Sequence, residues 1–130
     1  MKVLDLNGRE HQLKYLNRSK ARKNTSSLHQ QARLLINELY QFDKIFEEVP
    51  VPGENLTLDF LIPSLKLVIE VHGEQHYKFV SHFHGTQAGF IGSKKRDARK
   101  KEWCILNNLD LVELKYDESD QWRYQLLGTN

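Results

Sequence analysis

The sequence predicts a mixed α/β fold of the α+β kind, in which a mixed central β-sheet is flanked by helices. Two apolar runs, 57–62 (TLDFLI) and 66–72 (KLVIEVH), are joined by a Pro-Ser break and together predict an antiparallel hairpin. Amphipathic helices are expected before and after this hairpin, and a further apolar strand follows the second helix. The order helix, strands, helix, strand is typical of a mixed sheet with helices packed on it.

The N-terminal half is expected to contain one helix and one short strand before the hairpin. Residues 1–24 predict a short strand or loop that runs into a basic stretch. Three hydroxyl residues at 25–27 offer helix N-caps, and apolar residues at helical spacing then predict a helix over about 27–42. Residues 46–51 predict a short strand, and 52–55 (PGEN) predict a turn.

The C-terminal half begins with the second hairpin strand, 66–72, which is apolar on both faces and is therefore expected at the centre of the sheet. Residues 78–93, rich in glycine and aromatic residues, predict a long loop of the kind that commonly has a function. Ser93 is expected to cap a helix over 94–108. The remaining segments predict a buried strand and a short closing helix, at 110–116 and 122–127.

Length and composition indicate one ordinary domain. The 130 residues are 39% hydrophobic and 28% charged, which is too apolar for a disordered chain. The single cysteine, Cys104, excludes an internal disulfide and a multi-cysteine zinc site. No apolar run approaches the ~20 residues that a membrane span needs, and the N-terminus lacks a signal-peptide stretch. We therefore expect an intracellular, cytoplasmic protein with no membrane partner.

The net charge of +2 is unevenly distributed. We expect residues 1–25 to form a basic N-terminal arm and residues 26–130 to form the domain. A second basic block, 94–101, contains one acidic residue. Two basic blocks around an acidic middle suit a polyanion held at the edges of a cation-binding centre, although solvated surfaces are the alternative. The residues expected to contact DNA phosphates are Arg18, Lys20, Arg22, Lys23, Lys94, Lys95, Arg96 and Lys100.

Charged residues interrupt the apolar hairpin. Asp59 lies on its first strand and Glu70 near the end of its second, so matched faces would bring both carboxylates to one divalent cation. Two carboxylates, a backbone carbonyl and waters suit Mg²⁺, with Mn²⁺ as the alternative. His72 faces the same side as Glu70, and His76 follows in the turn beyond. A zinc site that adds His82 and His84 is a further alternative.

These residues resemble the PD-(D/E)XK nuclease superfamily. Leu58-Asp59 stands where the superfamily has Pro-Asp, and Glu70-Val71-His72 stands where it has (Asp/Glu)-X-Lys. The histidine resembles the branch of very-short-patch-repair-like and EDxHD-type homing endonucleases. The matching residues are Glu38, Asp59-Phe60, Ile69-Glu70-Val71-His72-Gly73, His76 and Asp97.

The resemblance implies a restriction-endonuclease-like sheet and a set of catalytic residues. Asp59 would be the central metal ligand, and Glu70 or His72 would hold the metal or the attacking water. His72 or His76 would be the general base, with Asp97 orienting one of them. Glu38 would contribute from the first helix. Lys95 would replace the missing lysine by contacting phosphate.

The resemblance therefore implies a Mg²⁺-dependent endonuclease of duplex DNA, such as a small homing enzyme encoded by a phage or another mobile element and acting in the host cell. A double-strand break would need a homodimer or two successive nicks. The open alternatives are a mismatch-type repair nickase, a junction resolvase, a non-catalytic DNA-binding module of the same fold, and a zinc-dependent hydrolase.

Overall fold

A four-stranded mixed sheet forms the centre of the fold in the computed structural model, which describes residues 1–13, 26–78 and 84–128. Its strand order is β3-β4-β5-β6, with β3–β4 and β4–β5 antiparallel and β5–β6 parallel. The predicted hairpin is confirmed, because Phe60 of one strand pairs with Ile69 of the next. The bounds are Phe46–Pro50 for β3, Thr57–Ile62 for β4, Leu67–His72 for β5 and Asp110–Lys115 for β6.

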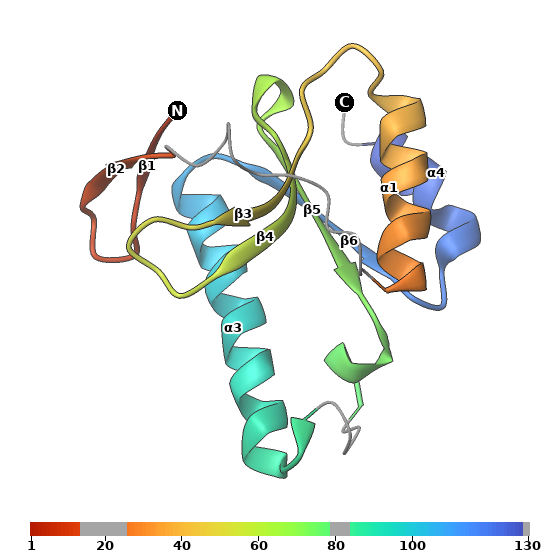
Figure 1. Ribbon diagram of the computed structural model, residues 1–130. Coiled ribbons are helices and arrows are strands. Elements are labelled where there is room, and N and C mark those ends of the chain that lie inside the picture. Colours follow the sequence, from red (N-terminus) through yellow and green to blue (C-terminus); the bar gives the residue numbers. More distant parts are fainter. Residues whose placement is uncertain (14–25, 79–83, 129–130) are drawn as a thin grey trace.

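Helices cover both faces of the sheet (Figure 1), which confirms the predicted fold class. Helices α1 (Ser27–Leu39) and α4 (Trp122–Leu127) lie on one side. The long helix α3 (Gln87–Leu106) lies on the other, near a small hairpin of β1 and β2. The bounds of that hairpin are Lys2–Leu4 and Glu10–Gln12. Short 3₁₀ turns occur at Pro63–Leu65, Glu74–His76 and Ser119–Gln121.

Two hydrophobic clusters fill the spaces between the sheet and these helices. On the α1 face, side chains of α1 and α4 pack on the inner sheet residues Phe60, Ile69 and Leu114. On the α3 face, Trp103 and Cys104 pack on the opposite side of the strands. This burial on both faces explains why β5 is apolar throughout, as its sequence indicated.

The regular alternation of side chains breaks at one point in β3 and β4. Leu58 and Phe60 would share a face in a regular strand, yet Leu58 packs in the α3-side cluster and Phe60 in the α1-side cluster. The pairing of the two strands omits Glu48 and Asp59, and Glu48 has a φ of 52°. A positive φ is uncommon for a residue other than glycine and directs attention to this position.

The start of the second long helix differs from the prediction. Helix α3 begins at Gln87 and is capped by Thr86, whose side chain accepts a hydrogen bond from the Gly89 N–H, so Ser93 is not its cap. Gly89 and Gly92 made the first two turns resemble a loop, because glycine is unfavourable in helices. Consequently residues 87–93 of the predicted loop belong to helix α3.

The structure describes only the first part of the N-terminal segment. Residues 1–13 form the β1–β2 hairpin, whose Val3 and Leu13 belong to the α3-side cluster. Residues 14–25 lie outside the described residues, and with them the expected phosphate contacts Arg18, Lys20, Arg22 and Lys23. Helix α1 ends at Leu39, three residues before the predicted end.

The two phenylalanines Phe60 and Phe42 give a matched test of the core. Phe60 is completely buried, whereas Phe42 is fully exposed. Phe60→Ala is expected to lower the free energy of unfolding by about 3–5 kcal/mol, because it leaves a cavity between α1 and the sheet. Phe42→Ala should change it by no more than about 0.5 kcal/mol. Urea unfolding followed by circular dichroism measures both, and equal losses would contradict this packing.

Candidate active site

Two cavities lie where β4, β5, α3 and the turn after β5 come together. Their volumes are about 360 and 450 Å³, and both are lined by Asp59, His76 and Lys100. The first cavity also has Glu70 and His29 in its wall, and the second has Arg96 and Asp97. Five of the six residues predicted to be catalytic therefore lie in or beside one region, since His72 stacks on His76 with ring centroids 4.1 Å apart.

The carboxylates of Asp59 and Glu70 hold the diverging ends of β4 and β5 together. The Asp59 backbone N–H donates a hydrogen bond of 2.6 Å to Glu70 Oε2. In return, the Val71 backbone N–H donates to Asp59 Oδ2 at 2.8 Å. These two bonds continue the hairpin beyond the last backbone pair, Phe60 and Ile69. The two carboxylates are thus adjacent, as the sequence predicted, and their positions are fixed by backbone groups.

Lys100 of α3 pairs directly with Glu70, through its Nζ and Glu70 Oε1. The Glu70 side chain is only 3% exposed and that of Lys100 only 17%. Burial and, after it, the neighbouring Asp59 charge raise the pKa of Glu70 above its ordinary value, and Lys100 acts to lower it. For Lys100, burial acts to lower the pKa, but the Glu70 charge outweighs it, so the pKa of Lys100 is raised. Lys100 is therefore a cation between two acidic groups.

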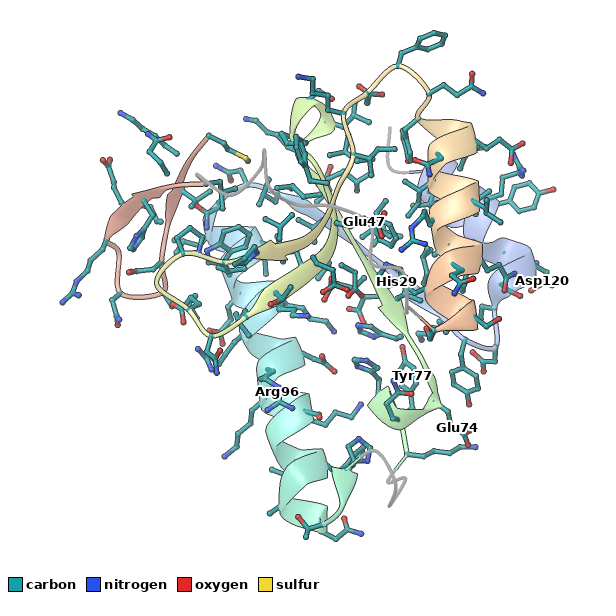
Figure 2. All side chains as sticks on the ribbon, viewed as in Figure 1. His29, Glu47, Glu74, Tyr77, Arg96 and Asp120 are labelled. Atoms are coloured by element: carbon teal, nitrogen blue, oxygen red, sulfur yellow. The ribbon has the colours of Figure 1, made fainter. Side chains whose placement is uncertain are left out.

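Asp59 also belongs to a group of possible cation ligands on the α1 side of the sheet. One donor atom each of His29, Glu48 and Asp59 lies within 4.8 Å of the others. His29 stacks on the Phe60 ring at 4.7 Å, and its Nε2 is 3.0 Å from Glu47 Oε1. Figure 2 shows His29 and Glu47 between α1 and the sheet. The left-handed backbone of Glu48 and the break in alternation therefore occur where carboxylates gather.

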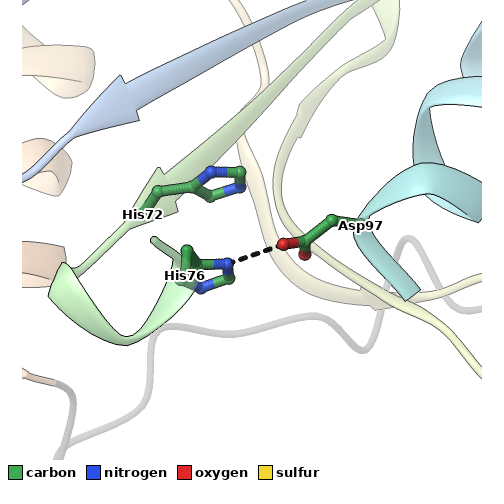
Figure 3. A group of neighbouring side chains, drawn as sticks. All are labelled: His72, His76 and Asp97. Atoms are coloured by element: carbon green, nitrogen blue, oxygen red, sulfur yellow. Dashed lines mark hydrogen bonds and ion pairs between the residues drawn. The ribbon is translucent and has the colours of Figure 1, made fainter. Parts of the chain in front are cut away.

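His76 and Asp97 form a hydrogen-bonded pair at the entrance of the turn after β5 (Figure 3). His76 Nδ1 lies 3.0 Å from Asp97 Oδ2, and the His72 ring is stacked parallel to that of His76. Burial acts to raise the pKa of Asp97, but the hydrogen bond and charge of His76 outweigh it, so the pKa of Asp97 is lowered. The expectation that Asp97 orients one histidine agrees with this geometry.

The other neighbours of His72 come from β6 and the turn. His72 Nδ1 lies 3.0 Å from Glu113 Oε2 and 3.2 Å from the Tyr77 hydroxyl. The hydrogen bond with His72 is the main cause that lowers the pKa of Glu113 to about 2, and Lys101 contributes from 3.1 Å. Burial raises the pKa of Tyr77 to about 12, so its phenol is neutral at pH 7. An ionised Glu113 accepts a hydrogen bond from His72 Nδ1 and so keeps the ring proton on that nitrogen.

The pair formed by His72 and Glu113 predicts how the free energy of unfolding depends on pH. Its folded pKa of about 2 lies below the ordinary value of 4.5, so the ionised group stabilises the folded state above pH 4.5. We expect this contribution to disappear as the pH falls from 4.5 to 2. Urea unfolding at a series of pH values should show that Glu113→Gln flattens the wild-type decline in this window. An unchanged decline would contradict the assignment.

Several predicted residues lie elsewhere. Glu38 lines neither cavity: its exposed carboxylate pairs with Arg123 of α4 at 2.9 Å. The structure therefore does not bring Glu38 to the other five residues. Lys95 is exposed on α3, and the lysine that pairs with the acidic residues is Lys100. Lys94 lies over the rings of Tyr77 and Phe90.

Sequence reasoning missed three contributors to this region: His29, Glu48 and Glu113. It also assigned Lys100 to DNA phosphates, whereas the structure pairs it with Glu70. One sequence signal was available for Lys100, because it follows Asp97 by three residues on a helix and so faces the same side. No comparable local signal marks Glu113, whose partner is set by the parallel pairing of β5 and β6.

Within 1–13, 26–78 and 84–128, no helix is long and apolar enough to cross a membrane.

Comparisons with known proteins give relatives but no family. No family model matches the chain, and no solved structure matches it. It is 42% identical over 66 residues to uncharacterized protein 307L of Invertebrate iridescent virus 6 and 34% identical over 67 residues to uncharacterized protein 033L of Invertebrate iridescent virus 3. It is 38% identical over 72 residues to uncharacterized protein 094L of Frog virus 3 (isolate Goorha).

These matches cover 51–55% of this chain and 34–46% of the viral proteins. The chain therefore spans less than half the length of the curated relatives that it matches. Each alignment thus covers about half of this chain, and all three matched viral proteins are described as uncharacterized.

Proposed function

We propose that this protein is a metal-dependent endonuclease that hydrolyses phosphodiester bonds of duplex DNA. One observation carries the proposal: the buried Glu70 beside Asp59, a partly buried lysine and a histidine–aspartate pair line two cavities that share Asp59, His76 and Lys100. Phosphodiester hydrolysis needs positive charge beside the phosphate and a group that accepts a proton from water. In these cavities, Lys100 is a candidate for the positive charge and His76 for the proton acceptor.

The residues around Asp59 fit a Mg²⁺ or Mn²⁺ ion. Asp59 accepts the Val71 N–H at Oδ2, and one of its carboxylate oxygens lies within 4.8 Å of ligand atoms of Glu48 and His29. The repulsion between Asp59 and Glu70, which contributes to the raised pKa of Glu70, marks an excess of negative charge that a cation would offset. Oxygen ligands with room for water suit these ions. We propose Asp59 and Glu70 as ligands, with Glu48 as an additional carboxylate.

A bound Mg²⁺ supplies charge neutralisation at the phosphate and lowers the pKa of water. The chain supplies the remaining functions. Asp97 accepts the Nδ1–H of His76, which leaves His76 Nε2 to accept a proton from the attacking water. Lys100 holds Glu70 in place and brings a cation to the wall shared by both cavities.

The exposed cations near the cavities suit a duplex DNA substrate. Arg96 lines the second cavity, and Lys94 and Lys95 are exposed on the same turn of α3. We propose that these residues contact phosphates on either side of the cleaved bond. One chain has one such site, so a double-strand break would require a homodimer or two nicks. The relatives' viral origin supports a virus- or mobile-element-encoded enzyme that acts in a host cell.

Supercoiled plasmid provides the test. Purified protein is incubated with plasmid in Mg²⁺, in Mn²⁺ and in EDTA, and the relaxed and linear products are quantified on agarose. We expect relaxed plasmid in either metal and none in EDTA. Binding to DNA without nicking in either metal would contradict the proposal and favour a non-catalytic DNA-binding module. Sequencing the cut ends gives the recognition site.

A further inference from the structure

We propose that His72, His76 and Asp97 form a second cation site, which binds a nitrogen-preferring divalent metal such as Zn²⁺. This site differs from the oxygen-rich group around Asp59 in both position and chemistry. It uses two imidazoles and one carboxylate, a donor set that suits zinc and other late first-row metals. The binding itself does not depend on the proposed nuclease activity.

The spacing of the donor atoms favours a shared cation. One donor atom from each of the three residues lies within 4.8 Å of the others. The 3.0 Å between His76 Nδ1 and Asp97 Oδ2 is somewhat shorter than the roughly 3.3–3.4 Å that separates two ligands of a tetrahedral ion, so a small outward movement of the two side chains would admit the ion. A cation would take the place of the proton in this pair. The His72 ring, stacked on that of His76, needs a small tilt to add its nitrogen.

The surroundings of His72 match those of metal-binding histidines. Its Nδ1 is engaged by Glu113 and lies near the Tyr77 hydroxyl, so Nε2 is the nitrogen left for a ligand. A carboxylate that accepts the second ring N–H is the usual outer partner of a metal-bound histidine, because it fixes the tautomer and increases ligand basicity. Lys101 in turn holds Glu113 at 3.1 Å.

Access and openness also suit a metal site. His72 is buried, whereas the side chains of His76 and Asp97 are 23% and 17% exposed. Both of these residues line the second cavity, which leaves space for water on the cation. Three protein ligands with an open fourth position are typical of non-structural zinc sites.

One consequence rests on the proposed function. The His76–Asp97 pair cannot both hold a cation and transfer a proton, so Zn²⁺ bound here would inhibit Mg²⁺-dependent nicking. Nicking in excess Mg²⁺ should therefore stop when one equivalent of Zn²⁺ is bound. Undiminished nicking by the zinc-loaded protein would overturn this inhibitory role.

Cobalt provides a direct readout of binding. Titration of the metal-free protein with Co²⁺ should produce visible d–d absorption that saturates at one equivalent, resists excess Mg²⁺ and disappears on addition of Zn²⁺. His76→Gln and Asp97→Asn should each abolish the band. Glu113→Ala should retain the band with affinity about 10- to 100-fold weaker, since it removes only the outer partner. Circular dichroism checks that each variant is folded.

Two controls separate this site from its alternatives. His11→Asn removes an imidazole that pairs with Asp5 at 2.8 Å and should leave the titration unchanged. Asp59→Asn should also retain the band, because it alters the other cation group. A band that survives both His76→Gln and Asp97→Asn, or that disappears in Asp59→Asn, would overturn the proposal. Absence of DNA nicking has no bearing on this titration, so the two proposals fail independently.

Discussion

Replacing Asp59 with asparagine is expected to reduce plasmid nicking by at least about 1,000-fold, which corresponds to several kcal/mol of transition-state stabilisation by the cation. Asparagine has the same shape and can still accept the Val71 N–H, so the hairpin should persist. What is lost is the negative charge of Asp59, which lies beside Glu70 and also belongs to the group with His29 and Glu48. The initial rate of supercoiled plasmid loss in Mg²⁺ measures the effect.

The control for this prediction is Asp43→Asn. Asp43 accepts a hydrogen bond from the Ser64 hydroxyl at 2.7 Å and lines neither cavity. Its replacement should leave the nicking rate unchanged. If Asp59→Asn nicks plasmid as fast as Asp43→Asn, Asp59 is not a metal ligand of the reaction. Unfolding by urea, measured on both variants, excludes loss of structure as the cause of a slower rate.

Lys100→Met should lower the free energy of unfolding by about 3–5 kcal/mol, the usual cost of leaving a buried charge without its partner. The reason is that Glu70 is almost completely buried and depends on Lys100 for its compensating charge. Without Lys100, which acts to lower the pKa of Glu70, that pKa should rise further, because burial and the Asp59 charge both raise it. Urea unfolding at pH 7 measures the loss.

Two further variants distinguish the buried pair from a general effect of lost charge. Lys101→Met removes the adjacent lysine, whose side chain is 56% exposed, and should cost only about 0–1 kcal/mol. The double variant Glu70→Gln with Lys100→Met removes both charges, so much of the stability should return, whereas nicking should be lost because the Glu70 ligand is absent. A double variant as unstable as Lys100→Met alone would show that packing, and not charge, determines the cost.

Much of the fold could be predicted because its signals are local. The strand at 57–62 and the closing helix at 122–127 have the predicted bounds, and a centrally placed β5 follows from its apolar residues on both faces. The start of α3 could not be placed in the same way. Its first turns contain Gly89 and Gly92, and tertiary packing and the Thr86 cap outweigh their low helix propensity.

The site was predictable where neighbouring strands alone determine it. Asp59 and Glu70 are adjacent because the hairpin register puts them there. The contact of His76 with Asp97 of α3 does not follow from strand pairing, and it was expected from the resemblance. The roles of Lys100 and Glu113 depend on how α3 and β6 pack against β5, which local patterns do not encode. For Glu38 the helix was predicted well, but the position of the side chain was not. Glu38 lies near the C-terminal end of α1, where it pairs with Arg123.

The irregular segment around Glu48 has a consequence for the solubility of the folded chain. Strand β3 is at one edge of the sheet, where unpaired backbone groups can template the addition of a strand from another molecule. A residue with left-handed backbone in the middle of a five-residue strand interrupts the row of groups that such an addition would need. The partly exposed carboxylate of Glu48 adds charge at the same place. The distortion that gathers carboxylates around Asp59 thus also protects an open edge from aggregation.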